Sequence, residues 1–378
     1  MSRLVRRTSA VVAALTVTAT VAVAGTFVVA TSASATVRAR ASTVKVQIDD
    51  GGCPAKLAVK AGPVNFEVEN DGSGAVSEFE VLAGDRIIGE VENVAPGLSR
   101  KFSLTLKPGR YTTSCPGGDR EHGTLVVTGT AATKLSAAQQ SAVDTYRRYL
   151  QDQAAQLVTL TRSFTDAVDA GNVDQAKAAY VAARLPYERI EPVAETFGDL
   201  DPQIDAREGD VPAEEWGGFH RIEQALWVAN STAGLSDVTA ALDVHVQRLA
   251  ALVPDVELQP AGIANGSVEL LNEVSSSKIT GEEERYSHTD LDDFQANVQG
   301  AQAAFAAIEP LLATRNAKLA SDIDARFAAV LAALAPYRQG PTFVSYTTLT
   351  EDDTKALAQA VDALAEPLSK VSKQVVGR

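Results

Sequence analysis

The sequence predicts a small β-sandwich followed by a larger all-helical part, a multidomain β-then-α chain. Short segments of alternating apolar and polar residues fill positions 43–129, and helical periodicity begins at residue 136 and continues to residue 378. A short junction at residues 130–135 separates the two textures. With 378 residues the chain is long enough for two separate cores.

Residues 1–35 are predicted to be a signal peptide for export. Three arginines form a basic start, an apolar run covers residues 10–30, and Ala33 and Ala35 flank a small-residue cleavage site. The apolar run is also close to the length of a membrane span, so an uncleaved anchor is the alternative. In both cases the rest of the chain is expected outside the cytoplasm, and cleavage would leave no transmembrane segment.

The charge of the chain argues against two classes of partner. Lys plus Arg number 34 and Asp plus Glu number 48, which gives a net charge of −14. Nucleic acids and anionic membranes are bound by clustered basic residues, so neither is an expected partner. An acidic chain suits cations, although acidity is also a common means of staying soluble.

The strands of the first part are predicted from period-two alternation. "TVKVQID" places Val44, Val46 and Ile48 on one face, and "VNFEVEN", "SEFEVL", "DRIIGEVE", "RKFSLTLK" and "GTLVV" continue the pattern. Turn signals such as "APG" and "KPG" separate these segments. Regularly spaced short strands of this kind are typical of a β-sandwich.

The second part is rich in alanine, which lets helices pack closely, so a helical bundle is expected. Ser236 and Thr289 are the predicted N-caps of two of its helices. The predicted helices cover residues 137–171, 173–197, 213–228, 236–252, 263–277, 290–313, 318–335 and 351–375.

The segment "WGGFHRIEQALW", residues 216–227, contains the most informative pair. His220 and Glu223 are three positions apart, so they project from one helix face and have the spacing to share a metal ion. Gly217 and Gly218 would let another backbone approach closely. An isolated pair of this kind is more often a solvated helix surface.

Two acidic clusters accompany this pair. Glu188 and Glu191 have the same spacing, and Pro192 after them removes a backbone donor and predicts a kink. The plainer alternative is that Glu188 pairs with Arg184. In "KITGEEERYSHTDLDDF" the aspartates after Thr289 suit a helix N-terminus, but the glutamates at residues 282–284 are not explained that way.

Several of these segments resemble one family in the expected order. "GGFHRIEQALW", "RIEPVAETFGDLDP" and "RYSHTDLDDFQANV" resemble the C-terminal domain of EfeO proteins, which belongs to the imelysin-like (peptidase M75) group with the motif G-x-H-x-x-E, here Gly218 to Glu223. "SEFEVL", "VENVAPG", "KPGRYTTSC" and "GTLVVTG" resemble the N-terminal cupredoxin-like domain of the same family. The resemblance implies a cupredoxin-like domain at 43–129, a linker at 130–135 and an imelysin-like domain at 136–378.

The resemblance implies a function in iron acquisition. Members of this family are extracytoplasmic (periplasmic or cell-envelope) iron-binding components of EfeUOB-type uptake systems, which include a membrane permease and a haem-peroxidase-like partner. Imidazole and carboxylate ligands form a hard set that suits iron, while zinc stays an alternative because it also binds such sites tightly. Carried onto this chain, the implied ligands are His220, Glu223, Glu188, Glu191 and Asp205, with Glu283 and Glu284 as further candidates.

The first part offers a second candidate site. It contains one histidine, His122, and the only methionine of the chain is Met1, which excludes a blue-copper site. Two interpretations of its cysteines stay open: a disulfide, as is usual in an oxidising compartment, or a Cu(II) or Fe(III) site with nearby glutamates, as the resemblance implies. The residues of that candidate site are Cys53, Cys115, Glu78 and Glu80.

Other functions compete with metal binding and delivery. A metal-dependent enzyme is one, either a ferroxidase or the peptidase that the family name suggests; a polysaccharide-binding protein with a bridging metal is another. The zinc-protease signature His-Glu-x-x-His is absent, and no serine or cysteine nucleophile has a convincing partner in the sequence. The sequence therefore favours a binding protein without catalytic residues.

Overall fold

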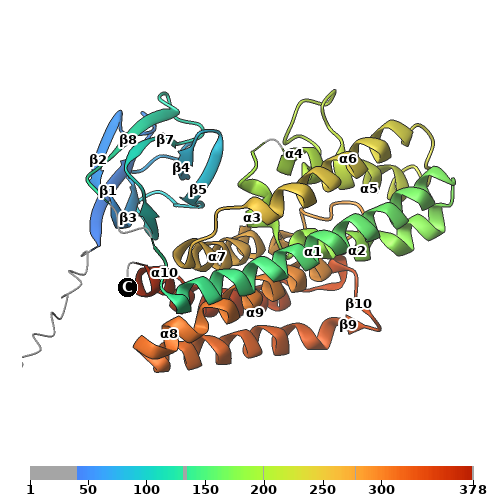
Figure 1. Ribbon diagram of the computed structural model, residues 1–378. Coiled ribbons are helices and arrows are strands. Elements are labelled where there is room, and N and C mark those ends of the chain that lie inside the picture. Colours follow the sequence, from blue (N-terminus) through green and yellow to red (C-terminus); the bar gives the residue numbers. More distant parts are fainter. Residues whose placement is uncertain (1–40, 131–133, 199, 277, 377–378) are drawn as a thin grey trace, which may run out of the picture. The chain divides into compact units, whose positions relative to one another are not determined.

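The computed structural model describes residues 41–130, 134–198, 200–276 and 278–376. The predicted signal peptide at residues 1–35 lies outside these described residues, as does the middle of the predicted 130–135 linker. Figure 1 shows strands in the first part of the described chain and helices in the second. Among the described helices, none combines the length and the apolar character that crossing a membrane requires.

The first part is built from two β-sheets. One sheet has the strand order β1-β3-β6 and the other has the order β2-β8-β7-β4-β5. β1 runs parallel to β3, and β2 runs parallel to β8. The strands are β1 (Ser42–Ile48), β2 (Lys56–Lys60), β3 (Gly62–Asn70), β4 (Phe79–Ala83), β5 (Arg86–Val91), β6 (Ser99–Leu106), β7 (Gly109–Ser114) and β8 (His122–Thr128).

The inward faces of the two sheets share one core, which confirms the predicted β-sandwich. Phe66 of β3 and Phe102 of β6 stack with ring centroids 4.7 Å apart, and Phe79 of the other sheet lies 6.1 Å from Phe66. Val46 and Ile48 are fully buried, as their alternation predicted. Apolar side chains at every second position therefore hold the sheets together.

The second part is helical around one large apolar core. Ser136 caps the first helix with a capping box: its hydroxyl accepts from the amide of Gln139 at 3.2 Å, and its own amide donates to Oε1 of Gln139 at 3.0 Å. The helices are α1 (Ala137–Asp169), α2 (Val173–Glu188), α3 (Glu191–Glu195), α4 (Leu200–Asp205), α5 (Gly218–Trp227), α6 (Ser236–Leu252), α7 (Pro260–Ser276), α8 (Asp290–Leu334), α9 (Glu351–Leu368) and α10 (Val371–Val375). Short 3₁₀ segments at Val253–Asp255 (η1), Lys278–Thr280 (η2), Ala335–Tyr337 (η3) and Tyr346–Thr348 (η4), and the strand pair β9 (Arg338–Gln339) and β10 (Thr342–Phe343), complete the list.

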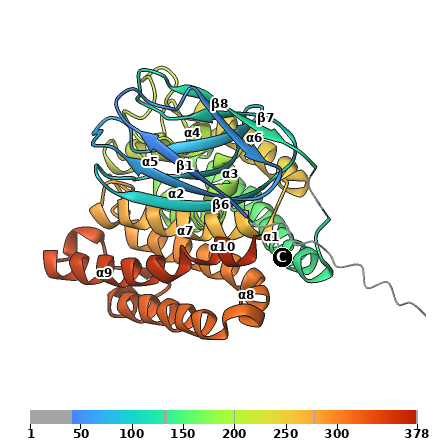
Figure 2. The ribbon, with the colours of Figure 1, turned by 90° about the vertical axis from the view of Figure 1, so that its left-hand side faces the viewer.

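The long helices pack along one another. α1 contacts α2, α6 and α8, and α7 contacts α8 and α9. Figure 2 shows α8, α9 and α10 gathered together, in orange to red. The bundle expected from the alanine-rich sequence is therefore present.

The prediction of one kinked helix over residues 173–197 was wrong. The chain instead forms two helices, since α2 ends at Glu188 and Pro192 lies in the first turn of α3. A proline ring clashes with the carbonyl four residues earlier, and that carbonyl belongs to Glu188. The freed carbonyl accepts a hydrogen bond from Nδ2 of Asn297 at 2.8 Å, so the break does not leave it unsatisfied.

Other boundaries also differ from the prediction. Ser236 is the first residue of α6 rather than its cap, because Leu235 takes the N-cap position. Thr289 does occupy the N-cap position of α8 but makes no side-chain capping hydrogen bond. The predicted break between residues 313 and 318 appears as a kink inside α8, where Asn316 has φ −152° and ψ 72°.

Candidate metal site

The imidazole of His220 lies at the centre of the candidate site and is 1% exposed. Its Nε2 is 3.5 Å from Oδ1 of Asp205 and 3.6 Å from Oε1 of Glu283, and it has no hydrogen-bond partner. One ligand atom from each of these three side chains lies within 4.8 Å of the others. We call Asp205, His220 and Glu283 the imidazole triad. A buried nitrogen without a partner is costly, and a cation among these three atoms would satisfy it.

A glycine brings two members of the triad together. Gly218 opens α5 with φ +69°, and a Cβ added there would overlap the carbonyl oxygen of Ile204. Only glycine accepts both the positive φ and this close approach. The predicted close approach of another backbone therefore occurs at Gly218 and not at Gly217, where an added Cβ would have no atom within 4 Å. The contact puts Asp205, the residue after Ile204, next to His220.

Glu223 is bonded to the far side of the imidazole. Its Oε2 lies 3.0 Å from Nδ1 of His220, and its Oε1 accepts the backbone amides of Tyr286 at 3.0 Å and Ser287 at 2.7 Å. Both oxygens are thus used within the protein. A carboxylate in this position fixes the orientation of the ring and directs Nε2 toward the other two triad residues.

Cations of the protein already contact the triad carboxylates. Arg184 forms an ion pair with Asp205. Oε1 of Glu283 lies 3.0 Å from Nζ of Lys278, and Oε2 lies 3.1 Å from Nη1 of Arg207. A metal ion entering the triad would therefore exchange with, or share, these contacts.

Glu188 and Glu191 surround a lysine rather than the imidazole. Nζ of Lys278 lies 3.2 Å from Oε2 of Glu188, 3.6 Å from Oε1 of Glu191 and 3.0 Å from Oε1 of Glu283. We call these three glutamates the lysine cage. Nδ2 of Asn297 donates to Oε2 of both Glu188 and Glu191, at 3.2 and 3.1 Å, which holds them in place. Glu283 belongs to both groups and connects the triad to the cage.

Arg184 links the remaining carboxylates. It is fully buried, and its Nε lies 2.5 Å from Oε1 of Glu284 and 3.2 Å from Oδ2 of Asp293. Its Nη2 pairs with Glu188, so the alternative partner expected from the sequence is present. Glu284 is further satisfied by the hydroxyls of Tyr180 and Ser287. Arg184 therefore balances several acids that would otherwise repel each other in the interior.

The electrostatics of the site favour a charged imidazole before any metal binds. Burial and the Arg184 charge lower the pKa of His220, but the Asp205 charge, the hydrogen bond with Glu223 and the nearby carboxylate of Glu283 raise it to about 9. Burial raises the pKa of the Glu283 carboxyl, yet the charges of Lys278 and His220 hold it well below its usual range. The triad is thus polarised, with an anionic carboxylate facing a cationic ring.

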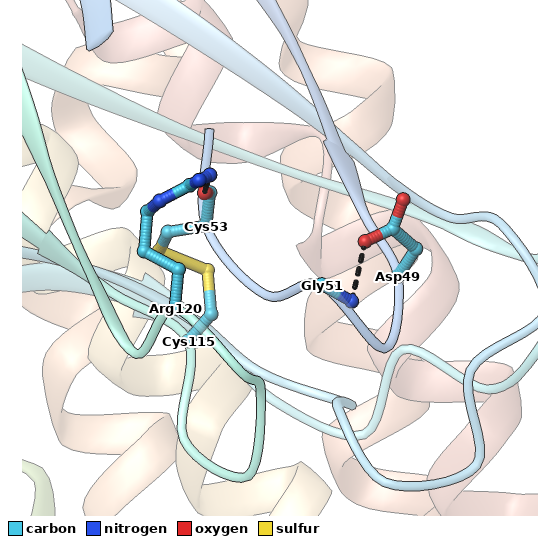
Figure 3. The surroundings of a disulfide bond; sticks show 5 residues. All are labelled: Asp49, Gly51, Cys53, Cys115 and Arg120. Atoms are coloured by element: carbon cyan, nitrogen blue, oxygen red, sulfur yellow. Dashed lines mark hydrogen bonds between the residues drawn. A yellow bond between two sulfur atoms is a disulfide. The ribbon is translucent and has the colours of Figure 1, made fainter. Parts of the chain in front are cut away.

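In the first part of the chain, Cys53 and Cys115 form a disulfide (Figure 3). The carbonyl oxygen of Cys53 accepts a hydrogen bond from Nη1 of Arg120 at 3.3 Å. Of the two interpretations left open by the sequence, the structure has the disulfide, and neither sulfur is a thiolate in this form. The proposed copper or iron site with sulfur ligands does not fit it.

Glu78, one of the two glutamates of that candidate site, lies in a cluster of carboxylates that does not include the cysteines. Glu78 comes within 4.8 Å of Glu90 and Glu92, ligand atom to ligand atom, and Glu80 is not in this group. Burial and then the neighbouring charge of Glu92 raise the pKa of Glu78 to about 9. Burial among other carboxylates therefore favours the protonated form of Glu78.

The structure brings the seven residues predicted for the helical part into one neighbourhood: Glu188, Glu191, Asp205, His220, Glu223, Glu283 and Glu284. Lys278, Asn297 and Asp293 also belong to this neighbourhood and are not among the predicted residues. In the sequence, Lys278 stands at the start of the acidic run "KITGEEER", and Asp293 is accounted for by the helix N-terminus. Only the fold shows that both face the same interior.

Comparisons with known families and proteins agree with this architecture. The family model described as imelysin (peptidase M75) matches residues 142–371, and the model of the cupredoxin-like domain matches residues 19–127. The chain is 40% identical over 340 residues to proteins named iron uptake system component EfeO from Escherichia coli K12 and Shigella flexneri. The match covers 87% of this chain and 90% of each relative.

Among solved structures, reduced rusticyanin aligns at 19% identity over 23% of this chain and 79% of that chain, with a TM-score of 0.19. At that score the family model, rather than the structural alignment, identifies the strands of residues 42–128 as cupredoxin-like. The predicted order of a cupredoxin-like part before an imelysin-like part is confirmed.

Proposed function

Because this chain belongs to the EfeO family of iron uptake system components, we propose that it captures iron at the imidazole triad outside the cytoplasm and passes it to a membrane permease. Nε2 of His220 and the carboxylates of Asp205 and Glu283 are the proposed ligands. The haem-peroxidase-like protein of the same type of system is the second proposed partner. Iron is here the cargo of the protein and not a resident cofactor.

One observation carries the proposal: Nε2 of His220 is buried, has no hydrogen-bond partner and faces two carboxylates. A neutral imidazole with oxygen ligands is a set that Fe(II) and Fe(III) accept. Glu223 supports the set by accepting the proton on Nδ1, as carboxylates behind metal-bound histidines do. We therefore propose an orienting role for Glu223. That Glu223 shares the ion with His220 stays a prediction, since one ligand atom each of His220, Glu223 and Glu284 lies within 4.8 Å of the others.

The cations around the triad suit a protein that must release its cargo. Binding would displace the Arg184 contact of Asp205 and the Lys278 contact of Glu283, and these contacts re-form when the ion leaves. Such an exchange lowers the net affinity without removing ligands. A site of this kind favours binding and delivery over permanent storage.

Calorimetric titration of the full chain with Fe(II) under anaerobic conditions, and with chelated Fe(III), tests the site. His220→Ala and Glu283→Gln should each weaken binding by about tenfold to a hundredfold. His245→Ala is the matched control, because His245 lies in α6 outside the triad and should leave binding unchanged. Wild-type affinity in His220→Ala would remove the triad as the iron site.

The enzyme alternatives lead to a separate measurement. The family name refers to a peptidase, so casein cleavage that His220→Ala abolishes would replace the binding proposal with a catalytic one. Oxygen consumption during Fe(II) addition tests ferroxidase activity in the same way. We propose binding rather than catalysis, since the relatives are named as uptake components and the triad ligands are enclosed by protein cations.

A further inference from the structure

The lysine cage next to the imidazole triad has the composition of a second cation site. Glu188, Glu191 and Glu283 are 0%, 6% and 4% exposed, and all three direct a carboxylate oxygen at Nζ of Lys278. Nζ is buried and makes no hydrogen bond of good geometry, although three carboxylates lie within 3.6 Å. The ammonium is held by charge, as a metal ion would be.

Glu283 belongs to both the imidazole triad and the lysine cage, and its position resembles that of a carboxylate that bridges two metal ions. Its Oε1 is 3.0 Å from Nζ of Lys278 and 3.6 Å from Nε2 of His220. In helical bundles that hold two metal ions, glutamates from different helices bridge and flank the pair. Here one position is the open triad and the other contains the ammonium of Lys278.

We propose that the ammonium of Lys278 takes the place of a second hard metal ion, so that this protein binds a single ion at the triad and has a latent second site in the lysine cage. This inference rests on the proposed function of the triad. Removing the lysine charge leaves Oε2 of Glu188, Oε1 of Glu191 and Oε1 of Glu283 without their lysine contact and able to bind a divalent cation of the size of Mn²⁺. Arg184 keeps its pair with Glu188, and Arg207 keeps its pair with Glu283. It also removes a competitor for Glu283, so the triad ion should bind more tightly.

The geometry supports a replacement over a simple structural salt bridge. A structural lysine usually makes hydrogen bonds to its partners, whereas Nζ of Lys278 faces three acids from the end of α2, the start of α3 and the segment after η2. Asn297 fixes two of those acids from α8 independently of the lysine. The cage is therefore expected to keep its shape when the ammonium is removed.

Mn²⁺ is the probe, because it is a hard divalent ion, does not oxidise readily in buffer and has a spectrum that reports on neighbouring ions. Wild-type full-length protein and Lys278→Met are titrated by calorimetry, and each loaded sample is measured by electron paramagnetic resonance. Lys278→Arg keeps the charge, and Lys370→Met makes the same change in an exposed pair with Glu366. Circular dichroism checks that each variant is folded.

Wild type, Lys278→Arg and Lys370→Met should bind one Mn²⁺ with the spectrum of an isolated ion. Lys278→Met should bind two, show a spin-coupled spectrum, and hold the first ion on the order of tenfold to a hundredfold more tightly. If Lys278→Met does not fold, Lys278→Gln replaces it, because the amide can still donate to one cage carboxylate. The expected result for Lys278→Gln is the same.

The outcomes separate this inference from the proposed function. If wild type and the neutral variants each bind one Mn²⁺ with equal affinity, the inference is overturned and the proposed triad site is unaffected. Two ions in wild type also overturn it. Loss of all binding in His220→Ala together with wild-type binding of one ion supports the triad, whereas no binding by wild type removes the proposed function and the inference with it.

Discussion

Replacing Arg184 with glutamine tests whether the buried carboxylates around the site depend on one guanidinium. Arg184 is fully buried, and its loss leaves five acids with fewer opposite charges: Glu188, Asp205, Glu283, Glu284 and Asp293. Removing one partner of a buried ion pair costs about 3–5 kcal/mol. With several acids affected, we expect the upper end, about 5 kcal/mol of the free energy of unfolding.

The assay is thermal and urea unfolding followed by circular dichroism in the absence of metal. For a helical part of this size, about 5 kcal/mol corresponds to a fall in Tm of about 10–20 °C. Arg326→Gln is the matched control, because Arg326 is 44% exposed and pairs with Asp322 on the same helix at 3.6 Å. An exposed pair contributes about 0–1 kcal/mol, so the control should lose at most a few degrees.

The pH dependence of this loss has a defined sign. Burial, and for Glu284 the Glu223 charge, already raise the pKa of Glu284 and Asp293 well above their usual range in the folded protein. Without Arg184 these pKa values rise further, so the folded variant binds protons that the unfolded chain has released, and stability falls as pH increases. A loss in Arg184→Gln no larger than in Arg326→Gln, at neutral and at alkaline pH, would refute the reasoning.

Three further predictions concern the triad. The pKa of His220 is about 9 without metal, so iron must displace a proton from the imidazole below that pH. The apparent affinity for iron should therefore rise with pH and level off near pH 9. Calorimetry in buffers of different ionisation enthalpy measures the proton released. Glu223→Gln should weaken iron binding about tenfold and lower the pKa of the His220 imidazole, measured by NMR titration, and an unchanged pKa would contradict the orienting role. Gly218→Ala should lose about 2–4 kcal/mol of the free energy of unfolding, because backbone strain at φ +69° adds to the overlap of the new Cβ with Ile204. The control Gly234→Ala has φ +77° and no atom within 4 Å of the new Cβ, so it should lose only about 1–2 kcal/mol. Equal losses in chemical unfolding of the two variants would show that the close approach at Gly218 is unimportant.

The fold was predictable because its signals are local. Alternation buried Val46 and Ile48 as expected, and a capping box at Ser136 starts the helical part where the texture of the sequence changes. Helix ends were less predictable, since they depend on neighbours. Pro192 causes α2 to end at Glu188 instead of kinking one continuous helix. The break is tolerated because Nδ2 of Asn297, 109 residues later in the chain, donates a hydrogen bond to the freed carbonyl of Glu188.

The residue types of the site were predictable and their roles were not. The spacing of His220 and Glu223 indicated a shared face, but only the fold shows that one imidazole nitrogen is bonded to Glu223 and the other is open. Lys278 carried no signal in the sequence, because a lysine before an acidic run is usually solvated. Its burial follows from the packing of η2 against α7 and α8.

Burial of the triad also determines how quickly an ion could enter or leave. Asp205, His220 and Glu283 are 8%, 1% and 4% exposed, so an ion in bulk water meets Nε2 only after a local opening of the chain. The observed loading rate should therefore rise with ion concentration and then level off at the rate of that opening. Unloading is governed by the same step, so an acceptor that speeds the opening would draw the ion out faster than dilution alone.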